Sequence, residues 1–417
     1  VPSACAVFTS DVPADAIALT MDPEDLHGPN GIADTTNSNF SRKGRAWQRE
    51  AWMQWGAKLA PVPLRAGISV AGSGSRGLPK KNFKLLARDR FGSDVPITLP
   101  DSSAWSEVTL RADATPNAFL RNLFMQEVVR RSGNHVDVQP STPLPLYLNG
   151  QYRGLYRAMP AKGKEWVERL NGGAATELME GPAGLAVTGK RTSYLRMLAA
   201  LGDQAPLDTL AKLIDLPSLI DLACFDLWTG RADHELNVRC WRPRDSDGRW
   251  RWILYDMDLW APPSDPTIAR MCSTPTMEVP YVPQLLGDRG TRDLLLARMS
   301  ALLATTLSPD RAAVLADSLF DRYADAMEKD QERSQGELEC PTPAAAHAEL
   351  MDHINGPSST LLQQLATQLG TTTRSVITIL NAWREAGLVD YEPGSARLTL
   401  RDPSRLGDIL RGADVNG

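Results

Sequence analysis

Two acidic segments, separated by an apolar run, carry the side chains best suited to chemistry. Asp233 is followed four residues later by Asn237, and Asp256 and Asp258 come directly after the aromatic and aliphatic run 250–255. Such a run is typical of a buried strand, and two ionised carboxylates at its end are costly to bury without partners. A bound divalent cation would keep them ionised. The oxygens of Asn237, Asp256 and Asp258 suit Mg²⁺ or Mn²⁺.

The order of these residues matches the phosphoryl-transfer site of protein kinases. There, one Asp accepts the proton of the acceptor hydroxyl, and an Asn a few residues later and an Asp after the next strand hold the metal ions. Asp233, Asn237 and Asp256 occur in the same order, which makes Asp233 the candidate base. On composition alone, a hairpin with a solvated and charged end is an equally good interpretation.

A basic stretch nearer the N-terminus could hold phosphate. A flexible Gly/Ser loop spans 72–77, and the run 80–87 is expected to form a strand with Lys80 and Lys84 on one face. Unhindered main-chain N–H groups and ammonium charges both favour an anion. Lysines on a strand are otherwise more often a solvated face. The sequence does not decide which of Lys80, Lys81 and Lys84 would contact phosphate.

Helices and a hairpin are expected to position these groups. Thr115-Pro116 predicts the start of a helix, and an amphipathic helix at 217–228 leads the chain to Asp233. Asn149-Gly150 stands between two apolar runs and predicts a β-hairpin. The proline-rich segment 261–283 is expected to be a loop that could shape an acceptor site.

Five segments together carry a family resemblance. They are DHELN at 233–237, GRWRWILYDMDLW at 248–260, GSRGLPKKNFKLLARDRFG at 74–92, DATPNAFLRN at 113–122 and LYLNGQYRGLYR at 146–157. Over roughly residues 15–330 the chain resembles the CotH family of atypical, secreted or spore-coat protein kinases. The resemblance implies ATP- and metal-dependent transfer of phosphate to protein hydroxyls. It implies Asp233 as the base, metal ligation by Asn237, Asp256 and Asp258, and phosphate contacts from Arg76, Lys80, Lys81 and Lys84.

One position departs from that family. Its hairpin is usually followed by an acidic residue, whereas Met159-Pro160 stand there in this chain. Either another acid substitutes, or the nucleotide is held differently, or the domain is a pseudokinase. In the last case it would be a non-catalytic surface or spore-coat binding protein.

Composition narrows the class of protein. A net charge of −5 and a pI near 5.7 argue against a protein whose whole surface binds nucleic acid. No run of 18 apolar residues occurs, so no transmembrane helix is expected. The five cysteines lack C-x-x-C spacing, which argues against structural zinc. Because the chain starts at Val1, an N-terminal signal could have been removed.

The C-terminal segment follows a different pattern. Residues 358–410 predict a helix, a glycine turn, a second helix and a two-stranded wing, and they resemble the winged helix-turn-helix of Crp/Fnr-type transcription regulators. That resemblance implies contact with DNA bases through residues 372–378. From 357 to 417 there are six arginines, no lysine and six acidic residues, so the module is neutral. Because affinity for phosphates needs basic residues, a structural or protein-binding role is as good an interpretation.

We therefore expect an α+β protein with a kinase-like domain at 1–330, a linker or exposed helix at 331–357 and a winged helix at 358–417. The expected cofactors are ATP and Mg²⁺ or Mn²⁺. The expected partners are a protein substrate and, through the winged helix, DNA or another protein. The first resemblance suggests a secreted or surface location and the second a cytoplasmic one.

Overall fold

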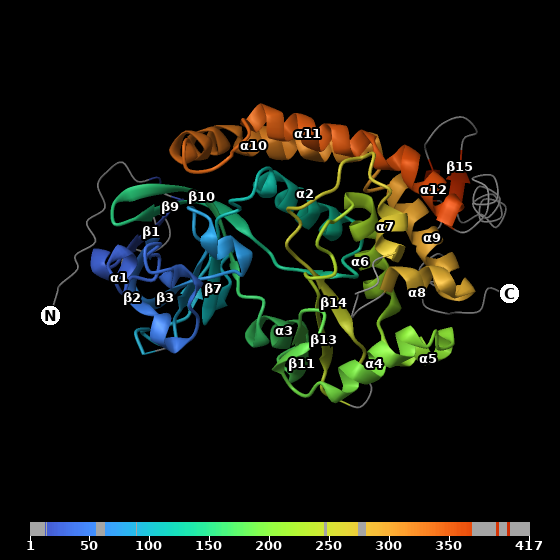
Figure 1. Ribbon diagram of the computed structural model, residues 1–417, viewed down its shortest axis with the longest axis horizontal. Coiled ribbons are helices and arrows are strands. Elements are labelled where there is room, and N and C mark those ends of the chain that lie inside the picture. The colour runs from blue at the N-terminus through green and yellow to red at the C-terminus, as the bar shows by residue number, and fades with distance from the viewer. Residues whose placement is uncertain are drawn as a thin grey trace. The chain divides into compact units, whose positions relative to one another are not determined.

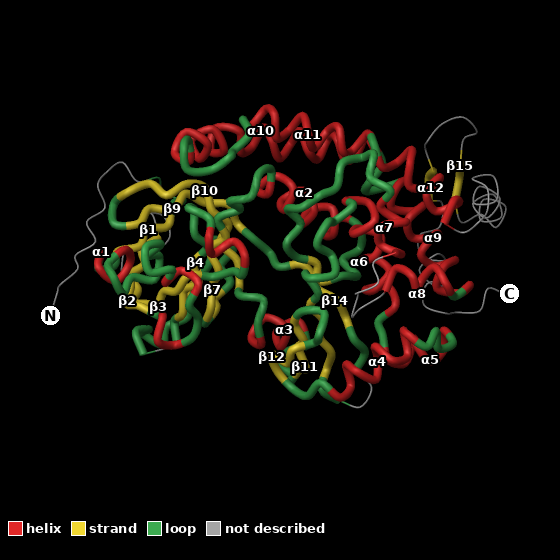
Figure 2. Tube along the Cα trace, viewed as in Figure 1, coloured by secondary structure: helices red, strands yellow, loops and turns green. Residues whose placement is uncertain are grey.

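The computed structural model describes residues 13, 15–55, 63–88, 90–245, 248–273, 281–368, 389–391 and 398–400 of the chain (Figure 1). Contacts within the chain divide it into two compact units. The first unit comprises Val1–Phe119, Gln139–Trp166 and Phe320–Ala346, and the second comprises Leu120–Val138, Val167–Leu319 and His347–Gly417. Strands dominate the first unit, and helices dominate the second (Figure 2).

The first unit is built around a closed barrel of strands. Its elements are β1 Ile17–Thr20, α1 Pro23–His27, β2 Arg49–Trp55, β3 Leu64–Val70, β4 Phe83–Leu86, β5 Ile97–Thr98, β6 Ala104–Trp105, β7 Glu107–Arg111, β9 Thr142–Leu148 and β10 Gln151–Pro160. The barrel order is β1-β2-β3-β4-β7-β10-β9, and parallel pairing of β1 with β9 closes it. Every second residue is buried in the latter parts of β2 and β9, as the two-residue period of a strand with one buried face requires.

The hairpin between β9 and β10 forms where the sequence predicts it. Asn149 and Gly150 have φ values of 51° and 77°, both positive as a tight two-residue hairpin turn requires. Further along β10, the register with β9 shifts between Tyr152 and Gly154, and Gly154 has a φ of 114°. Such an irregularity bends the strand locally and changes which groups face a neighbouring element.

The second unit combines helices with a mixed sheet. The remaining elements, some of which have residues in both units, are α2 Ala118–Arg131, β8 Asp137–Val138, α3 Lys164–Leu170, β11 Thr176–Glu180, β12 Leu185–Thr188, α4 Thr192–Gly202, α5 Leu207–Leu213, α6 Leu216–Thr229, β13 Arg239–Pro243, β14 Arg251–Leu254, α7 Thr267–Ser273, α8 Tyr281–Gly287, α9 Arg289–Ala304, α10 Pro309–Ser334, α11 Pro343–Asn355, α12 Pro357–Gln368, β15 Val389–Tyr391 and β16 Leu398–Leu400. The sheet order is β12-β11-β13-β14-β8, and β14 pairs in parallel with β8.

The helix α6 lies at the centre of the second unit and is buried along almost its whole length. Asp215 caps its first turn by accepting a hydrogen bond from the Ser218 N–H at 3.2 Å. The Ser218 hydroxyl oxygen in turn accepts from the Trp252 N–H at 2.8 Å, which ties α6 to β14. The helix and the strand that flank the two acidic segments are therefore joined directly.

The α+β fold class is confirmed, and two local predictions are wrong. The proline-rich segment is not a continuous loop, because it contains α7 at Thr267–Ser273 and the start of α8 at Tyr281. The strand expected at 80–87 is limited to β4, Phe83–Leu86. The segment 331–357, expected to be a linker or an exposed helix, holds the end of α10, the whole of α11 and the first residue of α12.

The described part of the C-terminal module agrees with its predicted pattern. Its first helix is α12, and β15 and β16 pair as an antiparallel wing. Residues 372–378 lie outside the described residues.

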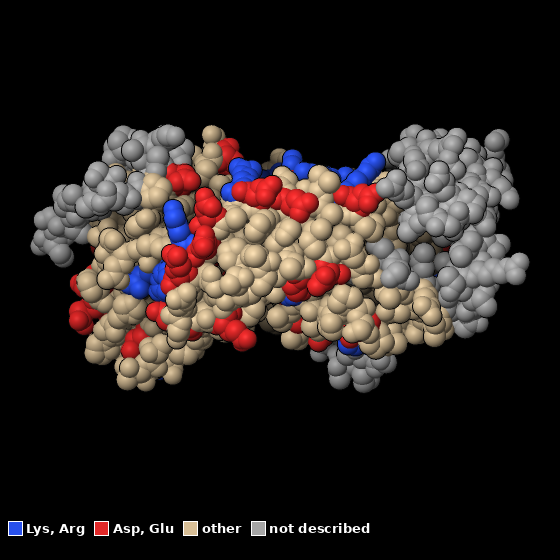
Figure 3. All heavy atoms as spheres, turned by 90° about the horizontal axis from the view of Figure 1, so that it is seen from above, with Lys and Arg blue, Asp and Glu red and all other residues tan. Residues whose placement is uncertain are grey.

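On the face drawn in Figure 3, acidic and basic side chains are interspersed. Among the described residues, no helix has the length and apolar character needed to cross a membrane.

Candidate active site

The end of α6 directs the chain into the loop that carries the candidate base. Gly230 follows α6 in the left-handed conformation, with a φ of 59°, which is a common helix end. A Cβ at Gly230 would lie 2.9 Å from Ala261 Cβ and 3.0 Å from Thr267 Oγ1. Both the backbone conformation and the lack of space therefore call for glycine at the point where the chain turns into Arg231.

A buried ion pair fixes the start of this loop. Arg231 and Asp226 are both 0 % exposed, and Arg231 Nε lies 3.0 Å from Asp226 Oδ1. The Tyr281 hydroxyl donates to Oδ2 of the same carboxylate. Burial and the charge of Asp226 hold the pKa of Tyr281 well above its ordinary value, so its hydroxyl remains a donor. Asp226 thus holds the loop through a cation and a phenol at once.

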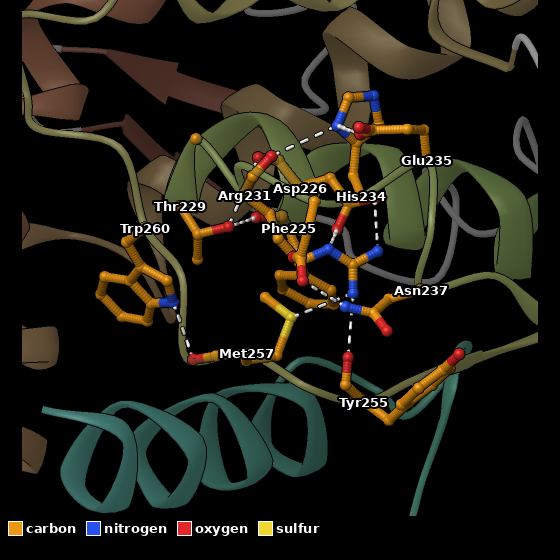
Figure 4. A network of polar contacts seen from close by, with 12 residues as sticks. Phe225, Asp226, Thr229, Arg231, His234, Glu235, Asn237, Tyr255, Met257 and Trp260 are labelled. Atoms are coloured by element: carbon orange, nitrogen blue, oxygen red, sulfur yellow. Dashed lines mark hydrogen bonds and ion pairs between the residues drawn. The ribbon is translucent and has the colours of Figure 1, made fainter. Parts of the chain in front are cut away.

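The same arginine connects the loop to the second acidic segment. Figure 4 shows Arg231 between Asp226, Tyr255 and Met257. Its Nη1 donates to the Tyr255 carbonyl at 2.9 Å and lies 3.5 Å from Met257 Sδ. Because Tyr255 and Met257 flank Asp256, Arg231 links the two segments that the sequence singles out.

Asp233 and Asn237 lie side by side in the loop after Arg231. Asn237 Nδ2 donates to Asp233 Oδ2 at 2.6 Å, and Asp233 Oδ1 is buried with no hydrogen-bond partner among the described residues. Burial raises the pKa of Asp233 to about 6, against the opposing charge of Arg231. The carboxylates of Asp256 and Asp258 act in the same direction as burial. A carboxylate that takes up a proton near neutral pH can act as a general base.

Asp256 and Asp258 follow β14 in a segment held by α2. Asp256 has a φ of 60°, a left-handed conformation that Asp and Asn adopt more readily than other non-glycine residues. Met257 is 2 % exposed, and its N–H donates to Asn122 Oδ1 at 3.1 Å. Arg121 Nη1 donates to the Asp258 carbonyl at 2.5 Å. Two side chains of α2 therefore fix the main chain that carries both acids.

The donor atoms of these residues are the kind that a hard divalent cation takes. Asp256 and Asp258 act on the pKa of Asp233, and Asn237 adds an amide oxygen. Carboxylate and amide oxygens suit Mg²⁺ or Mn²⁺, so the donor chemistry fits such an ion. Within the described ranges, no group of three or more His, Cys, Asp and Glu side chains is placed to hold a metal ion. The predicted set has two carboxylates and one amide.

In the first unit, the buried Lys80 is held in an ion pair. Its ammonium lies 2.8 Å from Asp330 Oδ2 on α10 and donates to the Leu155 carbonyl on β10, also at 2.8 Å. The same nitrogen lies 5.0 Å from the centre of the Tyr156 ring, and Lys80 is 4 % exposed. The interpretation of this lysine as part of a solvated strand face is therefore wrong.

Lys81 and Arg76 both donate hydrogen bonds to main-chain carbonyls at the Gly/Ser loop 72–77. Lys81 Nζ donates to the Arg76 carbonyl at 2.7 Å and lies 4.6 Å from the centre of the Phe40 ring. Burial lowers the pKa of both side chains. The Arg76 guanidinium donates to the carbonyls of Gly72, Phe40 and Arg42 at 2.8 to 3.0 Å. These contacts order the loop, and a phosphate contact of either residue stays a prediction.

Lys84 differs from the other two lysines in its exposure. Its side chain is 38 % exposed on β4 and pairs at 3.1 Å with Glu107, whose side chain is 44 % exposed. Exposed ion pairs of this kind contribute little to stability. Lys84 is therefore the most accessible of the three lysines, whereas Lys80 is buried and paired with the half-buried Asp330.

Sequence reasoning missed Arg231 and Asp330. Arg231 stands two residues before Asp233, and a single basic residue after a buried helix was the available signal. Asp330 lies 250 residues from Lys80, and no local pattern connects the two. By contrast, Arg121 and Asn122 belong to the segment that carries the family resemblance, and the structure gives both a contact with the second acidic segment.

Two family models match the chain. The model described as CotH kinase protein matches residues 68–361, which is more than half of the chain. The model described as Crp-like helix-turn-helix domain matches residues 358–409. A comparison with curated proteins gave no match. Both resemblances seen in the sequence are confirmed, and the chain belongs to the CotH kinase protein family.

Proposed function

We propose that the protein transfers the terminal phosphate of ATP to a hydroxyl group of a protein substrate, with Asp233 as the base. The pairing of Asp233 with Asn237 carries this proposal. The Asn237 amide orients the carboxylate at 2.6 Å and leaves the other oxygen buried without a partner in the described residues. An oriented carboxylate with one unpartnered oxygen is suited to accept a hydroxyl proton. Membership of a kinase family supports the reaction class.

In this proposal Asn237, Asp256 and Asp258 are the metal ligands. Asn237 donates through Nδ2, so its amide oxygen is left to act as a ligand beside Asp256 and Asp258. A divalent cation held there would neutralise and orient the phosphates. Arg121 and Asn122 contribute by fixing the main chain between the two acids.

The candidates for phosphate contact are Arg76, Lys80, Lys81 and Lys84. Among them, Lys80 has its ammonium fixed by Asp330 and by the Leu155 carbonyl. A cation that is already held in one place loses less rotamer freedom when an anion binds. We therefore assign the main phosphate contact to Lys80.

The test is transfer of labelled phosphate from ATP to a generic acceptor protein, with Mg²⁺ or Mn²⁺. The wild-type chain should incorporate label, and Asp233→Asn should not. Asp208→Asn is a matched control, because Asp208 is an exposed acid on α5 of the same unit. If neither metal supports incorporation above the Asp233→Asn background, the domain is a pseudokinase. That outcome would fit Pro160 at the position of the family acid.

A second function is favoured by the match to the Crp-like helix-turn-helix domain. We infer that residues 358–409 contact DNA or a partner protein, alongside any phosphoryl transfer. The equal numbers of arginines and acidic residues from 357 to 417 favour weak non-specific affinity for DNA. Binding of the full chain to random-sequence duplexes tests the DNA alternative.

A further inference from the structure

The Asp330 carboxylate contacts one cation, Lys80, and the main chain of one residue, Leu155. Asp330 Oδ2 lies 2.8 Å from Lys80 Nζ, and its Oδ1 accepts from the Leu155 N–H at 3.0 Å. Lys80 in turn donates to the carbonyl of the same Leu155. The acid and the lysine therefore bind both polar groups of one residue of β10, and each fixes the position of the other.

Gly154 provides the space for this arrangement. A Cβ at Gly154 would lie 2.1 Å from Asp330 Oδ1 and 2.9 Å from Lys80 Cε, and its φ of 114° is also unfavourable for other residues. The irregular register of β10 between Tyr152 and Gly154 places this glycine beside the carboxylate. The strand is thus shaped to admit an acid from α10.

Lys80 has one more N–H donor than its hydrogen bonds in the described residues use. An ammonium group has three N–H donors, and in the described residues Asp330 and Leu155 take two of them. The Tyr156 ring, 5.0 Å away, covers another side of the charge. The remaining donor is the one left for an oxygen of an anion.

We propose that Asp330 is a positioning residue, which holds the Lys80 ammonium where it contacts a nucleotide phosphate. This inference rests on the proposed function, because it assumes that Lys80 binds ATP. It adds an acid that lies 250 residues further along the chain and comes from α10. In this chain α10 is then part of the nucleotide-binding apparatus as well as of the fold.

The direction in which ATP affinity changes when Asp330 is replaced distinguishes positioning of Lys80 from a simple effect of charge. ATP is an anion, so the loss of a carboxylate near its site would by charge alone strengthen binding. If Asp330 positions Lys80, its loss leaves the lysine free to adopt other rotamers, and binding weakens. We expect a loss of about tenfold, because ordering a lysine side chain costs rotamer entropy of that size.

The experiment is calorimetric titration of the full chain with ATP and Mg²⁺, together with a thermal melt of each variant. Asp330→Asn should weaken ATP binding about tenfold, in line with the entropy of ordering one lysine. Asp325→Asn removes the same charge from an exposed position on the same helix and should leave affinity unchanged. In a Lys80→Met background, Asp330→Asn should have no further effect on affinity, since a positioning residue acts only through the lysine.

A pair of glycine variants tests the same idea without removing any charge. Gly154→Ala should displace Asp330 and weaken ATP binding as Asp330→Asn does. Gly150→Ala is the matched control, because it also has a positive φ on the same hairpin, but a Cβ there would meet no atom within 4 Å. Its affinity for ATP should equal that of the wild type, whatever its melting temperature.

Three results would overturn the inference. The first is that Asp330→Asn lowers the melting temperature but leaves ATP affinity equal or stronger, which makes the acid a structural tie for α10. The second is that it weakens binding equally in the Lys80→Met background. The third is that the wild-type chain binds no ATP at all. Only this third result also removes the proposed function, so the two failures are distinguishable.

Discussion

Arg231 and Asp226 form an ion pair at 3.0 Å that is entirely withdrawn from solvent, with both residues 0 % exposed. Such a pair is a weak source of net stability, because desolvation of the charges offsets their attraction. Removal of one partner, however, leaves the other charge buried without compensation. The pair therefore ties correct folding of the second unit to the position of the loop that carries Asp233.

Arg231→Met should destabilise the fold by about 3–5 kcal/mol, the range for breaking a buried ion pair from one side. The measurement is urea unfolding followed by tryptophan fluorescence. Arg289→Met is the control, because the side chain of Arg289 is 87 % exposed and its nearest acid is 3.8 Å away. The double change Asp226→Asn with Arg231→Met should recover part of the loss. Equal stability of Arg231→Met and Arg289→Met would contradict the role given to the pair.

Asp233→Asn and Asp256→Asn should differ in their effects on the nucleotide. Asp233→Asn should lower the transfer rate by about a hundredfold or more, as loss of a general base does, and leave metal-dependent ATP affinity nearly unchanged. Asp256→Asn should lose both rate and affinity. Asn is the right replacement at Asp256, because it tolerates the φ of 60° found there. If both variants weaken ATP binding equally, Asp233 is a ligand or a structural acid.

The buried imidazole of His353 should make stability depend on pH. Burial lowers the pKa of His353 to about 4, only partly offset by the Trp228 carbonyl 3.0 Å from Nε2. The ordinary value is 6.5, so between these two pH values the unfolded chain binds a proton that the folded chain does not. The neutral His353 imidazole makes its full contribution to stability above pH 6.5, and this contribution is lost as the pH falls toward 4.

His353→Gln should therefore make the free energy of unfolding fall less steeply between pH 7 and pH 5. By linkage, the slope should decrease by close to one proton per molecule, the proton that His353 takes up in the unfolded chain. The slope of unfolding free energy against pH is the quantity to compare, since the change also alters packing against Trp228 and Trp260. His347→Gln is the matched control, because it removes a histidine whose side chain pairs with the exposed Asp317. An unchanged slope in His353→Gln would show that this imidazole is not the source.

The helix α12 should stabilise the kinase-like region although it is also the first helix of the C-terminal module. Leu361 and Leu365 are 2 % and 1 % exposed, and Gln364 accepts from the Ile268 N–H and donates to the Asp265 carbonyl. A chain that ends at residue 356 should therefore melt lower than one that ends at residue 368, because it loses both buried leucines. The two family models overlap at 358–361, in this same helix. Equal melting temperatures would place the boundary before α12.

Binding of the C-terminal module to random-sequence DNA should be weak. Its charges are balanced, and the main source of non-specific affinity is release of counterions by basic residues. At physiological salt we expect a Kd above about 10⁻⁴ M for a random duplex, the weak end of non-specific binding. Fluorescence anisotropy at salt concentrations between about 50 and 200 mM would measure how the affinity for DNA depends on salt. A tight and steeply salt-dependent complex would contradict the prediction.

The parts of the structure that the sequence predicts are those with local causes. Asn149-Gly150 suffices for the hairpin because its two positive φ values are a property of those residues themselves. The helix α6 follows from its apolar pattern, and Gly230 supplies its end. Asp233 and Asn237 are four residues apart, so their contact is also local.

The parts that the sequence does not predict depend on distant partners. Lys80 is buried because Asp330 and Leu155 accept its hydrogen bonds from 250 and 75 residues away. The helix α7 forms in a proline-rich segment, where the Ile268 N–H in its first turn donates to Gln364, 96 residues further along. Alternation and turn signals contain no information on such contacts, which explains both errors.

The attachment of Met257 bears on how this protein could be switched on and off. Its N–H is held by Asn122, its carbonyl accepts from Trp260 Nε1 at 2.9 Å, and its sulfur lies beside Arg231. A flip of the peptide before or after Met257 would break at least one of these contacts and withdraw a buried side chain. We therefore expect this acidic segment to hold one conformation throughout turnover. In the proposed function, regulation would then act through access of ATP or of the acceptor, and not through movement of the acidic segment.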